Sequence, residues 1–127
     1  MTPEVEAAIE EVKATFPGHR VEVEPDDQGG AYVVVHDVAV GERYTPSTTW
    51  VGFLIAFQYP HVDVYPHFID GNLHRVDGRP HGNGFSGPTS WRGRQALQVS
   101  RRSPRWHPAL DTAVGKLLKV VDWVKLQ

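Results

Sequence analysis

Apolar residues recur at helical spacing near both ends of the chain. Pro3 suits the first turn of a helix, and the apolar positions after it in residues 3–16 are spaced by three and four: Val5, Ala8, Ile9, Val12 and Phe16. Residues 108–126 form a second such pattern, about five turns long. Its apolar face holds Leu110, Ala113, Val114, Leu117, Leu118, Val121 and Val124, and Lys116, Lys119 and Lys125 lie off that face. The pattern predicts one helix at each end of the chain.

The region between these helices has the short apolar runs of β-strands, separated by turn residues. Strands are expected at residues 21–24, 31–40, 50–59 and 62–69. Residues 70–94 are rich in glycine and poor in aliphatic side chains, which predicts a long irregular loop of a kind that often carries function. The order helix, antiparallel strand meander, loop, helix indicates an α+β fold with its helices packed on one sheet. We expect a single domain over residues 1–127.

Composition and charge exclude several classes of function. The 127 residues include no cysteine, so the chain can form neither a disulfide nor a thiolate metal site, and it has no cysteine nucleophile. A formal net charge of −2 argues against a general binder of nucleic acid or membrane surfaces. No apolar run approaches the roughly 20 residues that span a bilayer, and no signal-peptide pattern is present, so we expect a cytoplasmic protein.

A strongly basic turn separates a short apolar run from the second helix. Ala96, Leu97 and Val99 precede it, and Trp106 follows it. The turn itself is too polar for a protein core and consists of Ser100, Arg101, Arg102, Ser103, Pro104 and Arg105. This pattern predicts an ordered surface loop held on both sides by buried anchors, which is a common setting for a functional site.

Several short motifs in this order resemble the ubiquitin-conjugating (E2) superfamily, and specifically its divergent bacterial E2-like members. They are Phe57-Gln58-Tyr59-Pro60, Tyr65-Pro66-His67-Phe68, His81-Gly82-Asn83 and Gly93 with Ala96-Leu97-Gln98-Val99, followed by Trp106-His107-Pro108-Ala109-Leu110. The tripeptide is similar to the His-Pro-Asn that precedes the E2 active site, with glycine in place of proline. The resemblance implies the E2 (UBC) fold and a role in a ubiquitin-like conjugation pathway.

In this alignment Ala96 stands where an E2 has its thioester-forming cysteine, so ordinary E2 chemistry is excluded. Two hypotheses follow. In the first, the protein accepts a ubiquitin-like protein from an E1-like activating protein on a serine hydroxyl, as an oxyester, and passes it to a target protein. In the second, it is a catalytically inactive E2-variant scaffold that binds the ubiquitin-like protein or the E1 without covalent capture.

The first hypothesis needs a nucleophile, a base and donors for the oxyanion. Ser100 is the preferred nucleophile and Ser103 the second candidate. The resemblance places His81 and His107 as candidate bases and Asn83 as an oxyanion donor. Three arginines are candidates for holding the oxyanion or an acidic partner: Arg101, Arg102 and Arg105. No cofactor is implied.

The sequence argues against two other classes of site. The histidine and aspartate sets His61, Asp63, His67 and His74, Asp77, His81 have spacings that match no zinc signature, so no metal site is predicted. A nucleic-acid surface would rest on Arg92, Arg94, Arg101, Arg102 and Arg105 with Trp91 and Trp106. The net negative charge and the lack of a recognisable binding motif argue against it.

Overall fold

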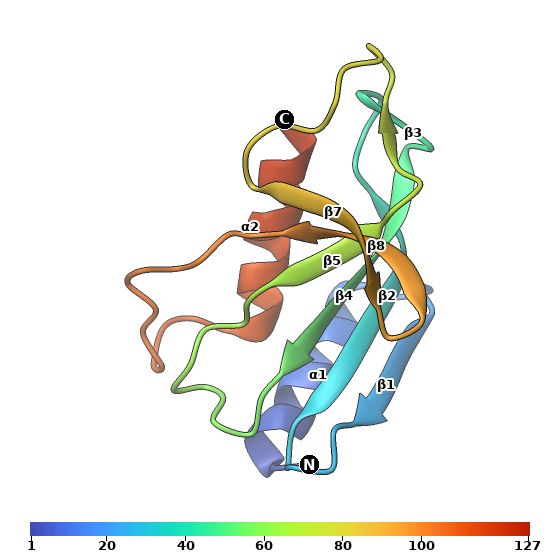
Figure 1. Ribbon diagram of the computed structural model, residues 1–127. Helices are drawn as coiled ribbons and strands as arrows, with labels where there is room; N and C mark the ends of the chain where they lie inside the picture. Colours follow the sequence, from blue (N-terminus) through green and yellow to red (C-terminus); the bar gives the residue numbers. More distant parts are fainter.

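The computed structural model describes residues 1–127 as two helices and two antiparallel sheets. The larger sheet has six strands in the order β1 (Val21–Pro25), β2 (Ala31–Ala39), β4 (Thr48–Ile55), β5 (His67–Asp70), β8 (Arg94–Val99) and β7 (Phe85–Trp91). The smaller sheet pairs β3 (Tyr44–Thr45) with β6 (His74–Arg75). Helices α1 (Pro3–Thr15) and α2 (Ala113–Lys125) lie side by side on one face of the larger sheet (Figure 1).

The core lies between this face and the two helices. Alternate residues of the central strands, such as Val33 and Val35 in β2 and Phe53 in β4, are fully buried and meet the apolar faces of α1 and α2. The predicted α+β fold, with both helices on one sheet, is therefore confirmed.

Both helices begin at a threonine that caps the first turn. Thr2 Oγ1 accepts the Val5 N–H at 3.1 Å, and Thr112 Oγ1 accepts the Gly115 N–H at 3.0 Å. The prediction that the second helix starts at residue 108 was wrong: a separate turn, closed by Asp111 Oδ2 and the His107 N–H at 2.7 Å, precedes Thr112. Leu110 is consequently 79% exposed.

Neither helix has the length and apolar character needed to cross a membrane.

The middle of the chain differs from its predicted boundaries in two places. The expected strands 50–59 and 62–69 are shorter, because residues 56–66 form a loop between β4 and β5 that contains Pro60 and Pro66. The expected irregular segment 70–94 contains β6 and the edge strand β7, which pairs with β8 from Phe85↔Val99 to Trp91↔Arg94. The side chains of β7 are mostly exposed and polar, so its backbone pairing left no apolar pattern in the sequence.

The tip of the β7–β8 hairpin packs on the outer face of the sheet. The Trp91 ring stacks on Phe68 at 4.9 Å and on Trp50 at 5.9 Å between ring centroids. Gly52 lies directly beneath it, and a Cβ at this position would overlap the indole ring. This packing fixes β8 against the sheet, and β8 leads directly into the basic loop.

Candidate functional site

The loop that joins β8 to α2, residues 100–112, projects from the body of the protein beside the loop of residues 56–66 (Figure 1). Two hydrogen bonds join the two loops, and a third joins the loop of residues 56–66 to α2. Trp106 Nε1 donates to the Pro60 carbonyl at 2.7 Å, the Ser103 N–H donates to Asp63 Oδ2 at 2.7 Å, and the Ala113 N–H donates to the Tyr59 hydroxyl at 3.0 Å. Burial raises the pKa of Tyr59, so this hydroxyl stays neutral.

Ser103, Lys116 and Asp63 form a compact polar cluster where the loop meets α2. Lys116 Nζ lies 2.6 Å from Ser103 Oγ and 3.0 Å from each carboxylate oxygen of Asp63. All three ammonium hydrogens therefore have an acceptor. The side chain of Lys116 is only 3% exposed and that of Asp63 18% exposed, so this is a largely buried ion pair with a serine hydroxyl attached.

Sequence reasoning missed this cluster because it placed Lys116 off the apolar face of the helix. The structure corrects that prediction, since Lys116 is buried among α2 residues that face the sheet. The spacing contains the signal: Lys116 follows Ala113 by three residues and precedes Val120 by four, which puts all three on one side of a helix. A lysine at such a position needs a buried partner, and Asp63 supplies it.

Ser100 has different surroundings. It continues the β8 strand, with its N–H donating to the Gly84 carbonyl at 2.8 Å. Its hydroxyl accepts a 3.2 Å hydrogen bond from the side-chain amide of Gln98. No ionisable side chain is hydrogen-bonded to Ser100.

The two candidate histidines and Asn83 lie in other surroundings. His81 stacks on Tyr44 and packs at a tilt against Phe85, and its Nε2 is 2.8 Å from the Leu73 carbonyl. His107 is exposed, and its Nδ1 accepts the Ala109 N–H at 3.1 Å. Asn83 is exposed in the turn before β7. No hydrogen bond joins any of the three to Ser100 or Ser103.

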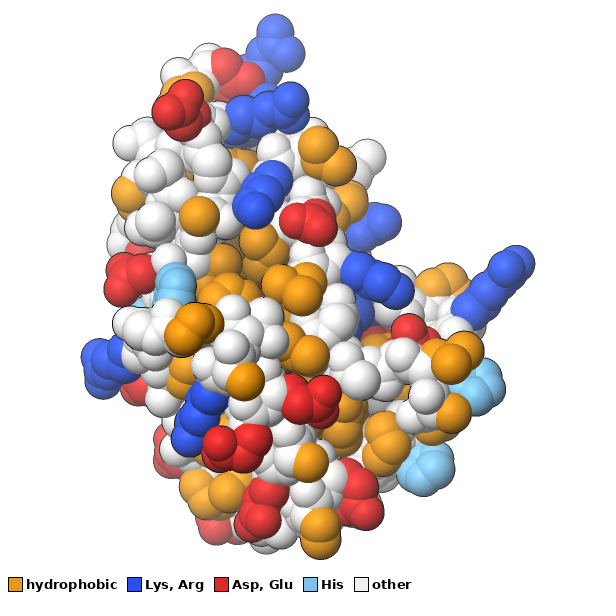
Figure 2. Space-filling model, turned by 180° about the vertical axis from the view of Figure 1, so that it is seen from behind, with side chains coloured by type: hydrophobic (Ala, Val, Ile, Leu, Met, Phe, Trp, Pro, Cys, Tyr) orange, Lys and Arg blue, Asp and Glu red, His pale blue; other side chains and the backbone are white.

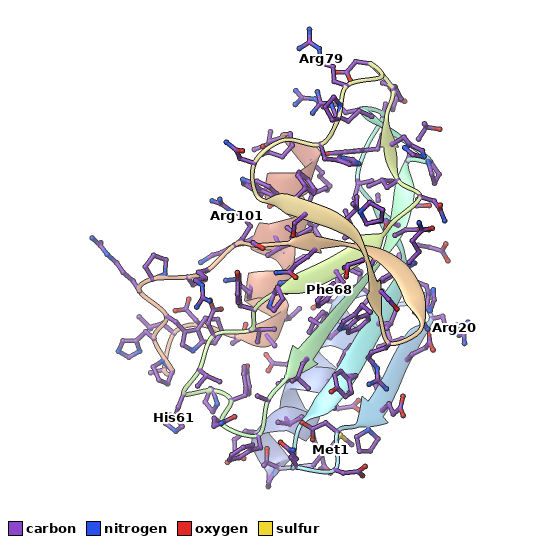
Figure 3. The ribbon with its side chains drawn as sticks, viewed as in Figure 1. Met1, Arg20, His61, Phe68, Arg79 and Arg101 are labelled. Atoms are coloured by element: carbon purple, nitrogen blue, oxygen red, sulfur yellow. The ribbon has the colours of Figure 1, made fainter.

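Aromatic rings hold two of the three predicted partner-binding arginines. The Arg101 guanidinium lies 4.7 Å from the Trp123 ring centroid, and that of Arg102 lies 4.3 Å from the Tyr65 ring centroid. Neither guanidinium forms an ion pair. Arg105 is exposed without a side-chain hydrogen bond. Figure 3 shows Arg101 at the base of the projecting loop, beside α2.

A cleft of about 260 Å³ opens between this loop and α2. It is lined by Arg101, Arg102, Ser103, Lys116, Lys119, Val120 and Trp123. Four of these seven residues are cations and none is an acid, so Ser103 lies at the wall of a cleft with positive potential.

The position that the sequence motifs aligned with the E2 cysteine lies within the sheet. Ala96 is fully buried in β8, with Asp70 of β5 on one side and Thr89 of β7 on the other. A nucleophile at this position would have no access to a partner protein. Any acyl chemistry must therefore use a different position.

One comparison with known proteins gave a match, and the matched residues include the site. The family model described as Prokaryotic E2 family E matches residues 15–127, from the end of α1 through α2. The chain belongs to prokaryotic E2 family E. Searches of curated proteins and of solved structures gave no significant match.

Membership of family E confirms the resemblance read from the short motifs and makes this an E2-like protein of a ubiquitin-like conjugation pathway. E2 proteins in general work with an E1 and a ubiquitin-like protein, so these are the partner classes of the family. This family E protein differs from ordinary E2 enzymes in having no cysteine.

The histidines considered for a metal site are dispersed. His67 is buried in β5, and Asp77 pairs with Arg75 at 2.7 Å. No three histidine, aspartate or glutamate side chains are arranged to hold a metal ion.

Trp106 is expected to stabilise the loop against the body of the protein. It packs near Tyr59, with ring centroids 6.4 Å apart, in addition to its hydrogen bond to Pro60. Trp106→Ala should lower the free energy of unfolding by about 3 kcal/mol, since it removes a large aromatic contact and a hydrogen bond. Urea unfolding of both proteins measures this difference, with Arg105→Ala as an exposed control in the same loop. A loss no larger than that of the control would show that Trp106 does not anchor the loop.

Proposed function

We propose that this E2-like protein carries the C-terminal acyl group of a ubiquitin-like protein as an ester on the hydroxyl of Ser103. The supporting observation is the 2.6 Å contact between Ser103 Oγ and Lys116 Nζ, which is in turn bonded to both oxygens of Asp63. A serine hydroxyl needs help to lose its proton at neutral pH. Ser103 has an ionisable pair beside it, whereas Ser100, the serine preferred from the sequence, has only Gln98.

The proposed step is an acyl transfer from an activated ester, such as a thioester on an E1-like protein. Ser103 Oγ attacks the carbonyl carbon, the new C–O bond forms, and the C–S bond breaks with its electron pair leaving on the thiolate. Lys116 first passes one ammonium proton to Asp63, and the neutral amine that results accepts the proton of Ser103. Asp63 then holds the proton and releases it to the departing thiolate or to water.

The surrounding cations suit the charge that develops in this step. The carbonyl oxygen becomes an oxyanion in the tetrahedral intermediate, and fixed positive groups lower the energy of that state. Arg101 and Arg102 line the same cleft as Ser103 and are free of carboxylate partners. The ester on Ser103 then passes its acyl group to a nucleophile of the target.

One assay tests the covalent step directly. The protein is incubated with the cognate E1, the ubiquitin-like protein and ATP. We expect an adduct that survives thiol reductant and is cleaved by hydroxylamine, and that is lost in Ser103→Ala and kept in Ser100→Ala. Because the chain has no cysteine, Ser103→Cys introduces the sole thiol and should convert the adduct to a thioester, which a thiol reductant cleaves by exchange. Formation of this thioester would also show that a Ser103 variant folds.

Loss of the adduct in Ser100→Ala alone would return the nucleophile to Ser100.

A second function, that of an E2-variant scaffold that binds without covalent capture, is favoured by the complete pairing of the Lys116 ammonium with three acceptors. Such pairing is also what a purely structural lysine requires. Stable binding to E1 or to the ubiquitin-like protein, with no adduct on any serine, would favour the scaffold.

A further inference from the structure

The cations that line the cleft beside Ser103 outnumber the carboxylates that neighbour them. Asp63 is bonded to Lys116, and Asp111 lies 3.9 Å from Lys119 in an exposed, loose pair. No acid pairs with Arg101 or Arg102. Figure 2 shows several Lys and Arg side chains along the side of the protein from which the loop projects.

Arg101 and Arg102 are held in place by aromatic rings, but their guanidinium N–H groups have no carboxylate partner. Each guanidinium lies near the face of an aromatic ring, at 4.7 Å for Arg101 over Trp123 and 4.3 Å for Arg102 over Tyr65. A ring face orients the planar group but accepts none of its N–H hydrogens in the way that a carboxylate does. The N–H edges thus remain available for carboxylate oxygens, the ligands that match their fork geometry.

We infer that the cleft binds acidic side chains in the C-terminal tail of the ubiquitin-like protein. This inference rests on the proposed function, since the acyl carbon must reach Ser103 while the residues before it lie among the cations of the same cleft. An extended chain advances about 3.5 Å per residue, so three residues cover about 10 Å. Because Arg101 and Arg102 line the same cleft as Ser103, the acidic residues are expected within about the last four residues of the tail, directly before the acyl group.

Peptide binding tests the inference without the conjugation reaction. Three fluorescently labelled tail peptides with amidated C-termini are compared by polarisation: Glu-Asp-Gly-Gly, Gln-Asn-Gly-Gly and Lys-Lys-Gly-Gly. Amidation removes the terminal carboxylate, so that only the side chains differ in charge. We expect the acidic peptide to bind at least about tenfold more tightly than the neutral one, with an affinity that falls as salt increases.

A charge reversal supplies the sharper result. Arg101→Glu/Arg102→Glu should weaken binding of the acidic peptide by at least about tenfold and give the lysine peptide the preference instead. The matched control is Arg20→Glu/Arg79→Glu, which has the same change in net charge. Neither of these arginines lines the cleft. Figure 3 shows Arg79 at the top of the molecule and Arg20 on the side away from the projecting loop. The control should keep the acidic preference.

The outcomes separate this inference from the proposed function. Equal binding of the three peptides, or no binding of any of them at millimolar concentration, overturns the acidic-tail assignment even where the Ser103 adduct forms. An acidic preference that persists in Arg101→Glu/Arg102→Glu also overturns it. A preference that reverses with the arginines supports the assignment, and it does so even if the adduct assay shows no covalent capture.

Discussion

An Asp63→Ala variant is expected to lose about 3 kcal/mol of unfolding free energy, because it leaves a buried cation without its counter-charge. The Lys116 side chain is 3% exposed, and both Asp63 oxygens contact its ammonium. The same substitution removes the acceptor of the Ser103 N–H. Both losses release the loop from α2, so the effect combines desolvation of a charge with the loss of a fixed hydrogen bond.

A second substitution shows whether the loss comes from the unpaired charge. Lys116→Met retains much of the apolar stem of the lysine and removes the cation, so Asp63→Ala/Lys116→Met should be more stable than Asp63→Ala by at least about 1 kcal/mol. Urea unfolding of the unsubstituted protein, the two single variants and the double variant gives the coupling energy between the two sites.

An exposed pair in the same helix provides the comparison. Asp122 lies 4.0 Å from Lys125, with side chains 74% and 46% exposed. Asp122→Ala should change stability by less than about 0.5 kcal/mol. An equally small change in Asp63→Ala would contradict the view that the buried pair stabilises the loop.

The sequence predicted those parts of the fold that follow from apolar periodicity. Val5, Ala8, Ile9 and Val12 are buried on one side of α1, as their spacing indicated. The edge strand β7 was missed because an exposed strand pairs through its backbone and needs no apolar side chains. The early start assigned to the second helix came from Leu110, which has the right spacing but lies in a turn before the capping Thr112.

The candidate site was predictable in position but not in its partners. The basic composition after Val99 indicated a functional loop, and the structure places Ser103, Arg101 and Arg102 around one cleft there. Lys116 contacts Ser103, which lies 13 positions before it in the chain, and Asp63, which lies 53 positions before it. Such contacts depend on how the loop of residues 56–66 folds, which local sequence patterns do not specify.

His67 makes the core itself sensitive to acid. It is fully buried in β5 between Phe53 of β4 and Val99 of β8, and neither ring nitrogen has a hydrogen-bond partner. Burial lowers the pKa of His67 from 6.5 to about 3, and the Lys116 ammonium adds to this shift. The folded protein therefore holds a neutral imidazole at pH values where the unfolded chain is already protonated.

The sign of the resulting pH dependence follows from proton uptake. The unfolded state binds a proton on His67 below its pKa of 6.5, whereas the folded state does so only near 3. The contribution of His67 to the free energy of unfolding is thus fully present above about pH 6.5 and is lost progressively as the pH falls towards 3. Between pH 7 and pH 5 this loss is about 2 kcal/mol. The lowered pKa of Glu22, about 2, affects stability only below its ordinary 4.5 and so leaves this window clear.

His67→Leu should remove this acid-sensitive component. We expect the fall in unfolding free energy between pH 7 and pH 5, measured by urea titration, to be smaller in this variant than in the unsubstituted protein by about 2 kcal/mol. His107→Leu, at an exposed position, is the matched control and should keep the original slope. Leucine approximates the volume of the buried ring, so the variant retains a filled core and any difference in slope reports the proton. Parallel pH profiles for His67→Leu and the unsubstituted protein would mean that the acid-sensitive group lies elsewhere, and that the buried imidazole takes up its proton equally in both states.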